Sequence, residues 1–344
     1  MKYKVLITDP ISDSGIKILQ DNNCEVIDKI NSKDSINSII DKIDAWIIRS
    51  GTQISEDYIK SAKQLKIIGR AGVGVDNIDI KTATKNGIVV MNVPDGNSIS
   101  AAEHTLAMIL ALSRNLHLGH STLAQGLWER SNLVGNELKG KTLGVVGLGK
   151  IGREVIERAL SFGLKILGYD PYVNKELYNE ERVEIVDLNT LTKKSDIITI
   201  HVPLNDSTRD LFDLKRIKMM KKEAKIINVA RGGIINELDL ATALNEKIIA
   251  GAGIDVFLKE PFDSNNPLKS ARNILLTPHL GASTYEAKEG VSVSICQQTI
   301  NFLENNKLNN VVNLPISDMG ILQEIQPYLK LSELVGKIQS QLID

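Results

Sequence analysis

A glycine pattern near the middle of the chain constrains the fold most strongly. The run Gly-Leu-Gly-Lys-Ile-Gly begins at Gly147, after an apolar run over 142–146 and before a helical pattern over 150–162. In such a strand–turn–helix unit Gly147 permits a tight turn, Gly149 lets backbone approach a pyrophosphate, and Gly152 lets helix and strand pack closely. Alternating strand and helix patterns continue on both sides of this motif. The sequence therefore predicts a nucleotide-binding domain inserted into another domain, with a cleft between the two.

Composition restricts the remaining possibilities. A chain of 344 residues is long enough for about two domains, and its net charge of −1 favours neither nucleic acid nor an anionic membrane as a partner. No apolar run reaches the roughly 18 residues that a membrane-spanning helix needs. Cys24 and Cys296 are isolated in the sequence, which argues against a disulfide framework or a metal site. We expect a cytoplasmic protein without a bound metal.

Short β-rich runs alternate with amphipathic helical patterns over most of the chain, which predicts an α/β protein with two Rossmann-like or flavodoxin-like parallel-sheet domains. Strands of the first sheet are expected at 5–8, 25–28, 46–49, 66–69 and 89–92, and those of the second at 142–146, 166–169, 197–201, 225–229, 249–254 and 274–277. Helices are expected at 12–21 with Ser12 as N-cap, 55–62, 98–125, 150–162 and 284–305 with Thr284 as N-cap. The expected domains are 1–97 with 282–314 for substrate, 98–281 for the nucleotide, and a tail over 315–344.

Asp170 indicates which nucleotide is bound. It ends the second strand of the nucleotide domain, about 20 residues after the glycines. A carboxylate at this place accepts hydrogen bonds from ribose hydroxyls and repels a 2′-phosphate. Pro171 and Tyr172 follow it, and no neighbouring arginine is present to receive that phosphate. The predicted cofactor is NAD, in preference to NADP.

Three residues after strands of the nucleotide domain suit hydride exchange with a 2-keto acid. Arg231 offers a planar fork that matches a carboxylate, and His279 titrates near neutral pH and can exchange a proton with the carbonyl oxygen. Glu260 can stabilise the protonated imidazole. Ligands of open α/β sheets bind at the carboxyl ends of strands, so these three are expected to converge. The sequence alone does not show that they meet.

The ordered motifs GLGKIG, Asp170, NVARGG, DVFLKEP and TPHLGAST resemble the D-isomer-specific 2-hydroxyacid dehydrogenase family over residues 3–314. The resemblance implies that Arg231 binds the substrate carboxylate and carbonyl, and that His279 is the acid and base with Glu260 as its partner. It implies further contacts with the cofactor, including one from Asp255 to the nicotinamide amide. The implied cofactor residues are Gly147, Gly149, Lys150, Ile151, Gly152, Asp170, Val202, Val229, Ala230, Arg231, Asp255, His279, Gly281 and Ala282. The other histidines, His104, His117, His120 and His201, are not expected to act as the base.

Motifs of the first domain resemble those members of the family that act on a phosphorylated hydroxy acid, 3-phosphoglycerate, and form phosphohydroxypyruvate. Such a substrate needs cations for its phosphate, for which Arg49 and Arg70 are the candidates. The full set of candidate substrate residues is Arg49, Ser50, Arg70, Val73, Gly74, Arg231, His279 and, from a neighbouring subunit, Arg130. The resemblance at Arg130 implies a homodimer.

Two alternatives remain open at the level of sequence. The first is a glyoxylate or hydroxypyruvate reductase, which shares the catalytic residues but holds no phosphate. The second is a scaffold that senses NADH, like the co-repressors of the same family. In the tail, a strand over 311–314 is expected to end at Pro315, and a helix over 326–338 to carry Pro327 in its first turn. This helix resembles the entry to a further domain in longer relatives, and inhibition by serine through such a domain is not expected of this chain.

Overall fold

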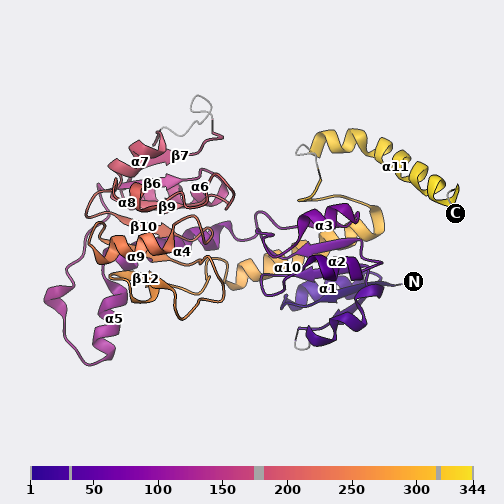
Figure 1. Ribbon diagram of the computed structural model, residues 1–344, viewed down its shortest axis with the longest axis horizontal. Helices are drawn as coiled ribbons and strands as arrows, with labels where there is room; N and C mark the ends of the chain where they lie inside the picture. Colours follow the sequence, from indigo (N-terminus) through magenta and orange to yellow (C-terminus); the bar gives the residue numbers. More distant parts are fainter. Residues whose placement is uncertain (1, 31–32, 174–181, 315–318, 343–344) are drawn as a thin grey trace. The chain divides into compact units, whose positions relative to one another are not determined.

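The computed structural model describes residues 2–30, 33–173, 182–314 and 319–342. It separates into two compact units (Figure 1). Unit 1 comprises Met1–Pro94 with Glu289–Asp344, and unit 2 comprises Asp95–Lys288. The boundaries between the units lie after residues 94 and 288. The sequence had predicted them after residues 97 and 281. The discontinuous unit encloses the other in the sequence, and each has a sheet of its own.

The sheet of unit 1 contains five parallel strands among the described residues. In spatial order they are β2 (Cys24–Asp28), β1 (Tyr3–Ile7), β3 (Ala45–Ile48), β4 (Ile67–Arg70) and β5 (Val89–Met91). This 2-1-3-4-5 order is the flavodoxin-like arrangement. The strand order reverses between β1 and β3: β2 is added on one side of β1, and the later strands are added on the other side. In doubly wound sheets a crevice forms at the carboxyl edge at such a point.

The sheet of unit 2 contains seven parallel strands among the described residues. In spatial order they are β12 (Ile274–Leu276), β11 (Gly251–Ile254), β10 (Lys225–Asn228), β9 (Ile197–Ile200), β6 (Thr142–Val146), β7 (Lys165–Tyr169) and β8 (Val183–Ile185). Counted from β6, the order 3-2-1-4-5-6 of a Rossmann sheet is extended by one strand. The expectation of six strands was wrong, because β8 is a three-residue edge strand with too few residues to show a pattern.

Helices connect the parallel strands, since a parallel pair cannot be joined by a tight turn. Unit 1 contains α1 (Asp13–Asp21), α2 (Glu56–Ser61), α3 (Ile80–Lys85), α11 (Met319–Leu342) and most of α10 (Tyr285–Asn305). Unit 2 contains α4 (Ser98–Ser113), α5 (Leu116–Ala124), α6 (Lys150–Ser161), α7 (Leu188–Lys194), α8 (Leu214–Ile217) and α9 (Glu237–Asn245). The predicted caps are confirmed: the Ser12 hydroxyl accepts from Gly15 N, and the Thr284 hydroxyl from Ala287 N.

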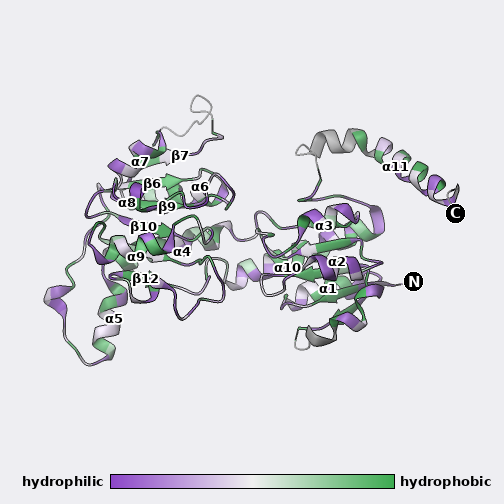
Figure 2. Cartoon of the chain, in the orientation of Figure 1, coloured by the Kyte–Doolittle hydropathy of each residue, from purple (hydrophilic) through white to green (hydrophobic). Residues whose placement is uncertain are grey.

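Hydrophobic side chains cover both faces of each sheet, as the continuous apolar runs of buried parallel strands require. In β10, Ile226 packs into the core on one face and Ile227 into the core on the other. In β3, Ile47 and Trp46 divide between the two faces of the smaller sheet in the same way. The strands are correspondingly green in Figure 2. The predicted strands are confirmed in both sheets, with ends shifted by at most two residues.

Three other expectations were wrong. The helix predicted over 98–125 is divided into α4 and α5, because Asn115 has a left-handed backbone with φ of 53°. The run 311–314 forms one isolated antiparallel bridge, from Val311 to Met91, and no strand; its predicted end at Pro315 lies outside the described residues. Pro327 lies inside α11, not in its first turn.

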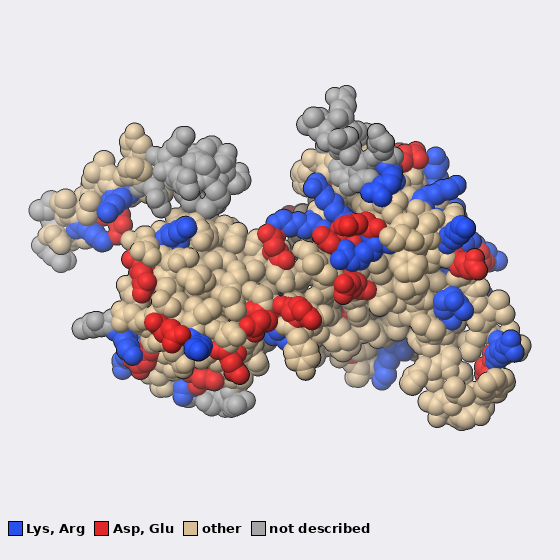
Figure 3. Space-filling model, turned by 180° about the vertical axis from the view of Figure 1, so that it is seen from behind, with Lys and Arg blue, Asp and Glu red and all other residues tan. Residues whose placement is uncertain are grey.

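Two surface properties bear on partners. In the described part of the chain, no helix combines the length and apolarity that crossing a bilayer requires. On the face shown in Figure 3, lysine and arginine side chains alternate with aspartate and glutamate.

Candidate active site

The glycine motif of unit 2 forms a tight turn between β6 and α6. Gly147 has φ of 98°, and a Cβ there would lie 2.5 Å from the carbonyl oxygen of His201. A Cβ at Gly152 would lie 2.1 Å from the carbonyl oxygen of Gly147. Gly149 differs, because no atom from another part of the chain lies within 4 Å of the position that its Cβ would take. The turn is therefore closed on the side of the sheet and open above Gly149.

This open turn fits the diphosphate of a dinucleotide. Gly149 is the N-cap of α6 and supplies no side-chain acceptor, so the first amides of the helix have no partner within it. Amides and the helix dipole at such an end attract an anion. The Asp170 carboxylate lies beside the turn, where it accepts from Leu148 N and Tyr172 N, both at 2.9 Å. Lys150, in the first turn of α6, pairs with Asp95. The residues present thus fit NAD.

His279 and Glu260 are in direct contact. Nδ1 of His279 lies 2.7 Å from Oε2 of Glu260, and Oε1 of Glu260 accepts from Phe257 N at 3.0 Å. Burial alone would raise the pKa of Glu260, but the hydrogen bonds from His279 and Phe257 outweigh it and hold that pKa below 4.5. Glu260 is therefore ionised at neutral pH and fixes the imidazole through Nδ1. Nε2 is the ring nitrogen left for proton exchange with a substrate.

The turn that carries His279 is held in an unusual conformation. His279 has φ of 55°, a left-handed region that few residues other than glycine adopt. Its backbone N donates to the carbonyl oxygen of Asp255 at 2.8 Å. The Asp255 carboxylate, which is fully buried, accepts from the next two amides, Leu280 N at 2.7 Å and Gly281 N at 2.9 Å. Asp255 thus fixes the His279 turn through its backbone and its side chain.

Arg231 follows β10 at the same edge of the sheet. The Asn228 side chain determines the shape of this turn, because its Nδ2 donates to Arg231 O at 2.8 Å and its Oδ1 accepts from Ala230 N at 3.0 Å. The guanidinium is half-buried and donates from Nη1 to Ala230 O at 2.7 Å. Val229 adjoins the His279 turn, since a Cβ at Gly281 would lie 2.8 Å from Val229 Cγ1. The loops after β10, β11 and β12 therefore meet at one edge.

Gly232 connects the arginine loop to the glutamate loop. A Cβ at this position would lie 2.0 Å from the backbone C and O atoms of Phe257. The neighbour is backbone and not a flexible side chain, so it cannot yield without moving the segment that donates to Glu260.

We expect Gly232→Ala to displace that segment and to lower kcat by about tenfold or more, together with a loss of thermal stability. Steady-state kinetics and a melting curve on the same preparation measure both effects. Gly290→Ala, on α10 and outside the candidate site, is the matched control for the collision, because the space beside Gly290 is open. Wild-type kcat in Gly232→Ala would contradict the proposed contact between the loops.

In unit 1 the candidate phosphate residues lie at the ends of adjacent strands. Arg70 ends β4, opposite Ile48 of β3, and Arg49 follows Ile48. Burial lowers the pKa of Arg49 and the nearby Asp9 carboxylate opposes that shift. A Cβ at Gly72 would lie 1.7 Å from Nη1 of Arg70, so the guanidinium occupies the space that a side chain would need. Glycine at this position therefore permits the observed placement of Arg70.

The remaining predicted residues have simpler surroundings. Val202 lies beside the glycine turn, its Cγ1 being 2.9 Å from the position of a Cβ on Gly147. Ile151, Ala282, Val73 and Gly74 are half-buried, and Ser50 is exposed. Arg130 begins a 3₁₀ turn (Arg130–Asn132) after α5 and is exposed.

The sequence interpretation missed residues that position these loops. Asp9 is almost fully buried, and its Oδ2 accepts from Arg49 N at 2.7 Å and Thr52 N at 2.9 Å. Glu237, at the start of α9, accepts from Leu258 N and Asn266 Nδ2, both at 2.6 Å, and so anchors the loop that carries Glu260. Asp9 could have been found from its place after β1. Glu237 gave no signal, since acidic residues are common in the first turn of any helix.

The prediction that none of the other histidines acts as the base is supported by the surroundings of His201 and His117. Burial lowers the pKa of His201 to about 3, so its imidazole is neutral, and its Nε2 lies 2.9 Å from the Thr199 hydroxyl. Burial also lowers the pKa of His117. Nε2 of His104 lies 3.2 Å from Oδ1 of Asp255.

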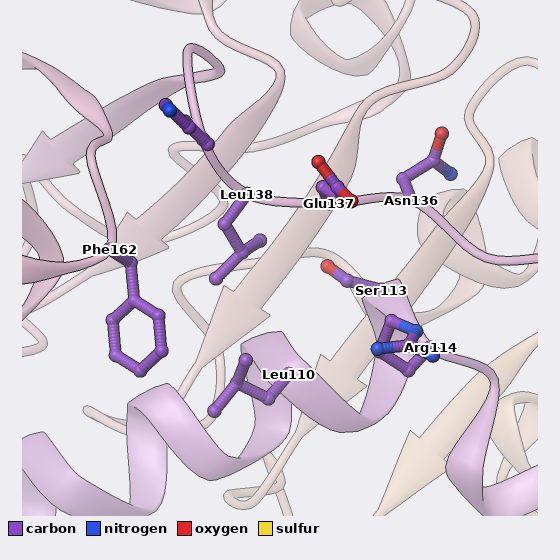
Figure 4. A pocket seen from close by; sticks show the side chains of 8 residues that line it. Leu110, Ser113, Arg114, Asn136, Glu137, Leu138 and Phe162 are labelled. Atoms are coloured by element: carbon purple, nitrogen blue, oxygen red, sulfur yellow. The ribbon is translucent and has the colours of Figure 1, made fainter.

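A pocket of about 270 Å³ in unit 2 lies apart from the candidate site (Figure 4). Its walls come from the end of α4, the segment before β6 and the residue after α6, and contain none of the predicted site residues. They are Leu110, Ser113, Arg114, Asn136, Glu137, Leu138, Lys139 and Phe162.

Comparison with known proteins agrees with this geometry. The chain is similar to D-3-phosphoglycerate dehydrogenases of Methanocaldococcus jannaschii (45% identity over 99% of this chain and 65% of that protein) and Homo sapiens (40%, 97% and 63%). It therefore spans less than two thirds of the length of these relatives. Among solved structures it is similar to D-lactate dehydrogenase from Aquifex aeolicus complexed with NAD and lactic acid, with a TM-score of 0.80, 27% identity, and coverage of 91% of this chain and 100% of that one.

A second solved structure, NAD-dependent formate dehydrogenase from Staphylococcus aureus in complex with NAD, matches with a TM-score of 0.81, 27% identity, and coverage of 91% of this chain and 99% of that one. The family model of the D-isomer specific 2-hydroxyacid dehydrogenase NAD binding domain matches residues 106–281, from α4 to the His279 turn. The chain therefore belongs to the D-isomer specific 2-hydroxyacid dehydrogenase family, and its unit 2 carries the NAD-binding domain.

Proposed function

We propose that the protein is a D-3-phosphoglycerate dehydrogenase, which oxidises C2 of 3-phospho-D-glycerate to the ketone of 3-phosphohydroxypyruvate, the first step of serine biosynthesis. The observation that carries the proposed chemistry is the 2.7 Å contact between His279 Nδ1 and Glu260 Oε2. It leaves one ring nitrogen for a proton and places an ionised carboxylate behind the other. The substrate assignment is supported by the named relatives and by Arg49 and Arg70 at adjacent strand ends.

In the proposed mechanism, the Arg231 guanidinium binds the substrate carboxylate through paired hydrogen bonds. NAD⁺, when bound, supplies the acceptor for the hydride that leaves C2. His279 Nε2 accepts the proton of the C2 hydroxyl, and the positive charge that the imidazole gains is stabilised by Glu260. The C–H and O–H bonds of C2 are broken and the C=O bond is formed. In the reverse direction His279 returns the proton to the carbonyl oxygen.

The proposed phosphate site includes Arg49 and Arg70, with Ser50, Val73 and Gly74 beside them in the sequence. Asn77 and Asp9 give this loop a defined shape: Asn77 Nδ2 donates to Arg49 O at 2.7 Å, and Asp9 accepts from Arg49 N. Because the backbone of Arg49 is already fixed by these hydrogen bonds, the side chain loses less conformational entropy when it binds a phosphate.

We expect Arg70→Gln to raise KM for phosphohydroxypyruvate by about ten- to a hundredfold, the effect of losing a charge-assisted hydrogen bond. KM for hydroxypyruvate, which lacks the phosphate, should change by less than about twofold. NADH oxidation is measured for wild type, Arg70→Gln and Arg49→Gln with both substrates and with glyoxylate. Lys63→Gln, at an exposed position before β4, is a control for loss of surface charge.

Other outcomes of this comparison identify the alternatives. Wild-type preference for glyoxylate or hydroxypyruvate, unaffected by either arginine variant, would replace the proposal with a reductase of the same family. NADH binding without turnover of any of the three acids would indicate the non-enzymatic scaffold.

We also propose a homodimer in the cytoplasm. The segment from α5 to the start of β6 exposes large apolar side chains, which a monomer rarely displays together. They are Leu116, Leu123, Leu127, Trp128 and Val134, with exposed fractions of 59%, 58%, 48%, 80% and 80%. Cytoplasmic location is supported by two buried thiols, Cys24 and Cys296, that form no disulfide.

We expect Trp128→Ser to shift the protein toward monomer, because this ring offers the most exposed aromatic surface of the segment. Light scattering after size exclusion measures the mass of each species across a dilution series. Tyr172→Ser, an exposed aromatic of the same unit outside this segment, is the matched control. A monomeric wild type at micromolar concentration would refute the dimer.

A further inference from the structure

His104 contacts the carboxylate that holds the catalytic turn. Its Nε2, on α4, lies 3.2 Å from Asp255 Oδ1 and 3.2 Å from the Thr277 hydroxyl oxygen. The Thr277 hydroxyl donates to the same Oδ1 at 2.6 Å. A hydrogen on Nε2 of His104 therefore points between Asp255 Oδ1 and the Thr277 hydroxyl oxygen. The imidazole is about one fifth exposed, at 19%, whereas the carboxylate has no exposed surface.

Four donors replace the lost hydration of the Asp255 carboxylate. A buried carboxylate is stable only where hydrogen bonds replace its lost hydration. Burial alone would raise the pKa of Asp255, and the hydrogen bonds from His104, Thr277, Leu280 and Gly281 outweigh it and hold that pKa below 3.8. His104 and Thr277 are the two side-chain donors, and the two amides belong to the His279 turn.

The two amides connect His104 to the chemistry. They follow His279 directly, and the N of His279 itself donates to Asp255 O. A left-handed backbone at a non-glycine residue persists only where surrounding contacts impose it. If Asp255 lost a side-chain donor, its carboxylate would be protonated more easily and would be free to rotate away from the two amides. The His279 ring would then lose its fixed approach to Glu260.

We propose that His104 is a positioning residue for the dehydrogenase reaction: through Asp255 it fixes the turn that presents His279. It is not the base, and it acts without touching the substrate. The inference rests on the proposed function for its kinetic consequences, whereas its structural part concerns the protein alone. The charged and titratable groups around Asp255 are His104 from α4, and His279 and Glu260 from the loops after β12 and β11.

The test compares three variants. His104→Leu removes the donor, His104→Gln keeps an N–H donor at about the reach of Nε2, and Thr277→Val removes the other side-chain donor. We expect His104→Leu to lower kcat by about tenfold with KM for the keto acid changed by less than about threefold. The acid limb of its kcat profile should move to higher pH, because loss of the hydrogen bond raises the pKa of Asp255. His104→Gln should restore most of kcat, and the acid limb of its profile should lie at the wild-type pH. Thr277→Val should move the limb in the same direction.

A second readout uses the protein without cofactor or substrate. The proton between His279 and Glu260 should give a low-field NMR signal in ¹⁵N-histidine-labelled protein, identified by its absence in His279→Asn. We expect this signal to broaden or vanish in His104→Leu and to persist in His104→Gln. An unchanged signal, kcat and pH profile in folded His104→Leu would overturn the inference, as would equal losses in His104→Leu and His104→Gln, which indicate packing alone. If wild type turned over no 2-keto acid, the proposed function would fail, and the NMR comparison would still decide the role of His104. Should His104→Leu not fold, Thr277→Val decides by the same two readouts.

Discussion

Replacing His279 with alanine is expected to lower kcat by about 10²- to 10⁴-fold, the contribution of a positioned general acid and base. The imidazole combines an ionised partner at 2.7 Å with a second nitrogen for proton exchange. NADH affinity should change by less than about threefold, because the proposed binding of the dinucleotide by the glycine turn and Asp170 does not depend on this ring. Stopped-flow turnover and NADH fluorescence titration on the same preparation separate the two effects. Retention of most of kcat would refute the assignment of His279.

Glu260→Gln provides the matched variant for this prediction. The amide keeps the shape and can still accept from Phe257 N, but it no longer stabilises a positive charge on His279. We expect kcat to fall less than in His279→Ala. We also expect the pH limb that reports the imidazole to move to lower pH, because a protonated ring is no longer favoured. A rate equal to that of wild type across the pH range would show that the carboxylate only orients the ring.

The free energy of unfolding should depend on pH through the contact between Glu260 and His279. The pKa of Glu260 lies below 4.5 in the folded state, so the folded protein binds this proton more weakly than the unfolded chain does. The contribution to stability is then fully present above about pH 4.5 and is lost as pH falls through the folded pKa. Asp255, whose pKa in the folded state lies below its ordinary value of 3.8, also stabilises the folded protein above that pH, and this stabilisation is lost at lower pH.

Local sequence pattern was enough for the strands but not for elements without a pattern of their own. The apolar runs of β6, β9 and β10 pack on both faces, so their composition alone marks them as buried parallel strands. The edge strand β8 has three residues, and the break after α4 depends on the backbone of Asn115. Neither leaves a periodic signal that sequence could reveal.

In the candidate site, too, some residues could be predicted from the sequence and others could not. Residues proposed to act on ligands carry distinctive chemistry, and Arg231, Glu260 and His279 were predicted from residue type and place after strands. The residues that hold them act on the backbone. Asn228 donates to the carbonyl oxygen of Arg231 in its own turn, and Glu237 accepts from the amide of Leu258 in another loop. Such contacts depend on which strands are neighbours and on exact distances, which one sequence does not provide. His104 is the clearest case, because its partner lies 151 residues away.

Replacing Arg231 with glutamine is expected to lower kcat/KM for the keto acid by at least about a hundredfold. The loss combines two charge-assisted hydrogen bonds to the substrate carboxylate, each worth about 1.5–3 kcal/mol, and about 1.4 kcal/mol corresponds to a tenfold change. Arg231→Lys keeps the charge but not the planar fork, so its kcat/KM should lie between those of wild type and Arg231→Gln. The backbone carbonyl of Arg231 still accepts from Asn228 in both variants, which protects the turn.

The discriminating measurement for Arg231 is kcat/KM for pyruvate and for its methyl ester, which has no free carboxylate. If the arginine binds the carboxylate, wild type should strongly prefer the acid, and Arg231→Gln should lose that preference while its residual rate with the ester stays near that of wild type. Arg209→Gln, at an exposed position in the same unit, should behave as wild type with both compounds. An equal loss of rate with acid and ester would assign Arg231 to the carbonyl oxygen or to the fold. Because Gly232, the next residue, abuts the backbone of Phe257, a loss through the fold would also weaken the contact between Glu260 and His279 and move the imidazole limb of the pH profile. A loss confined to carboxylate recognition leaves that limb in place.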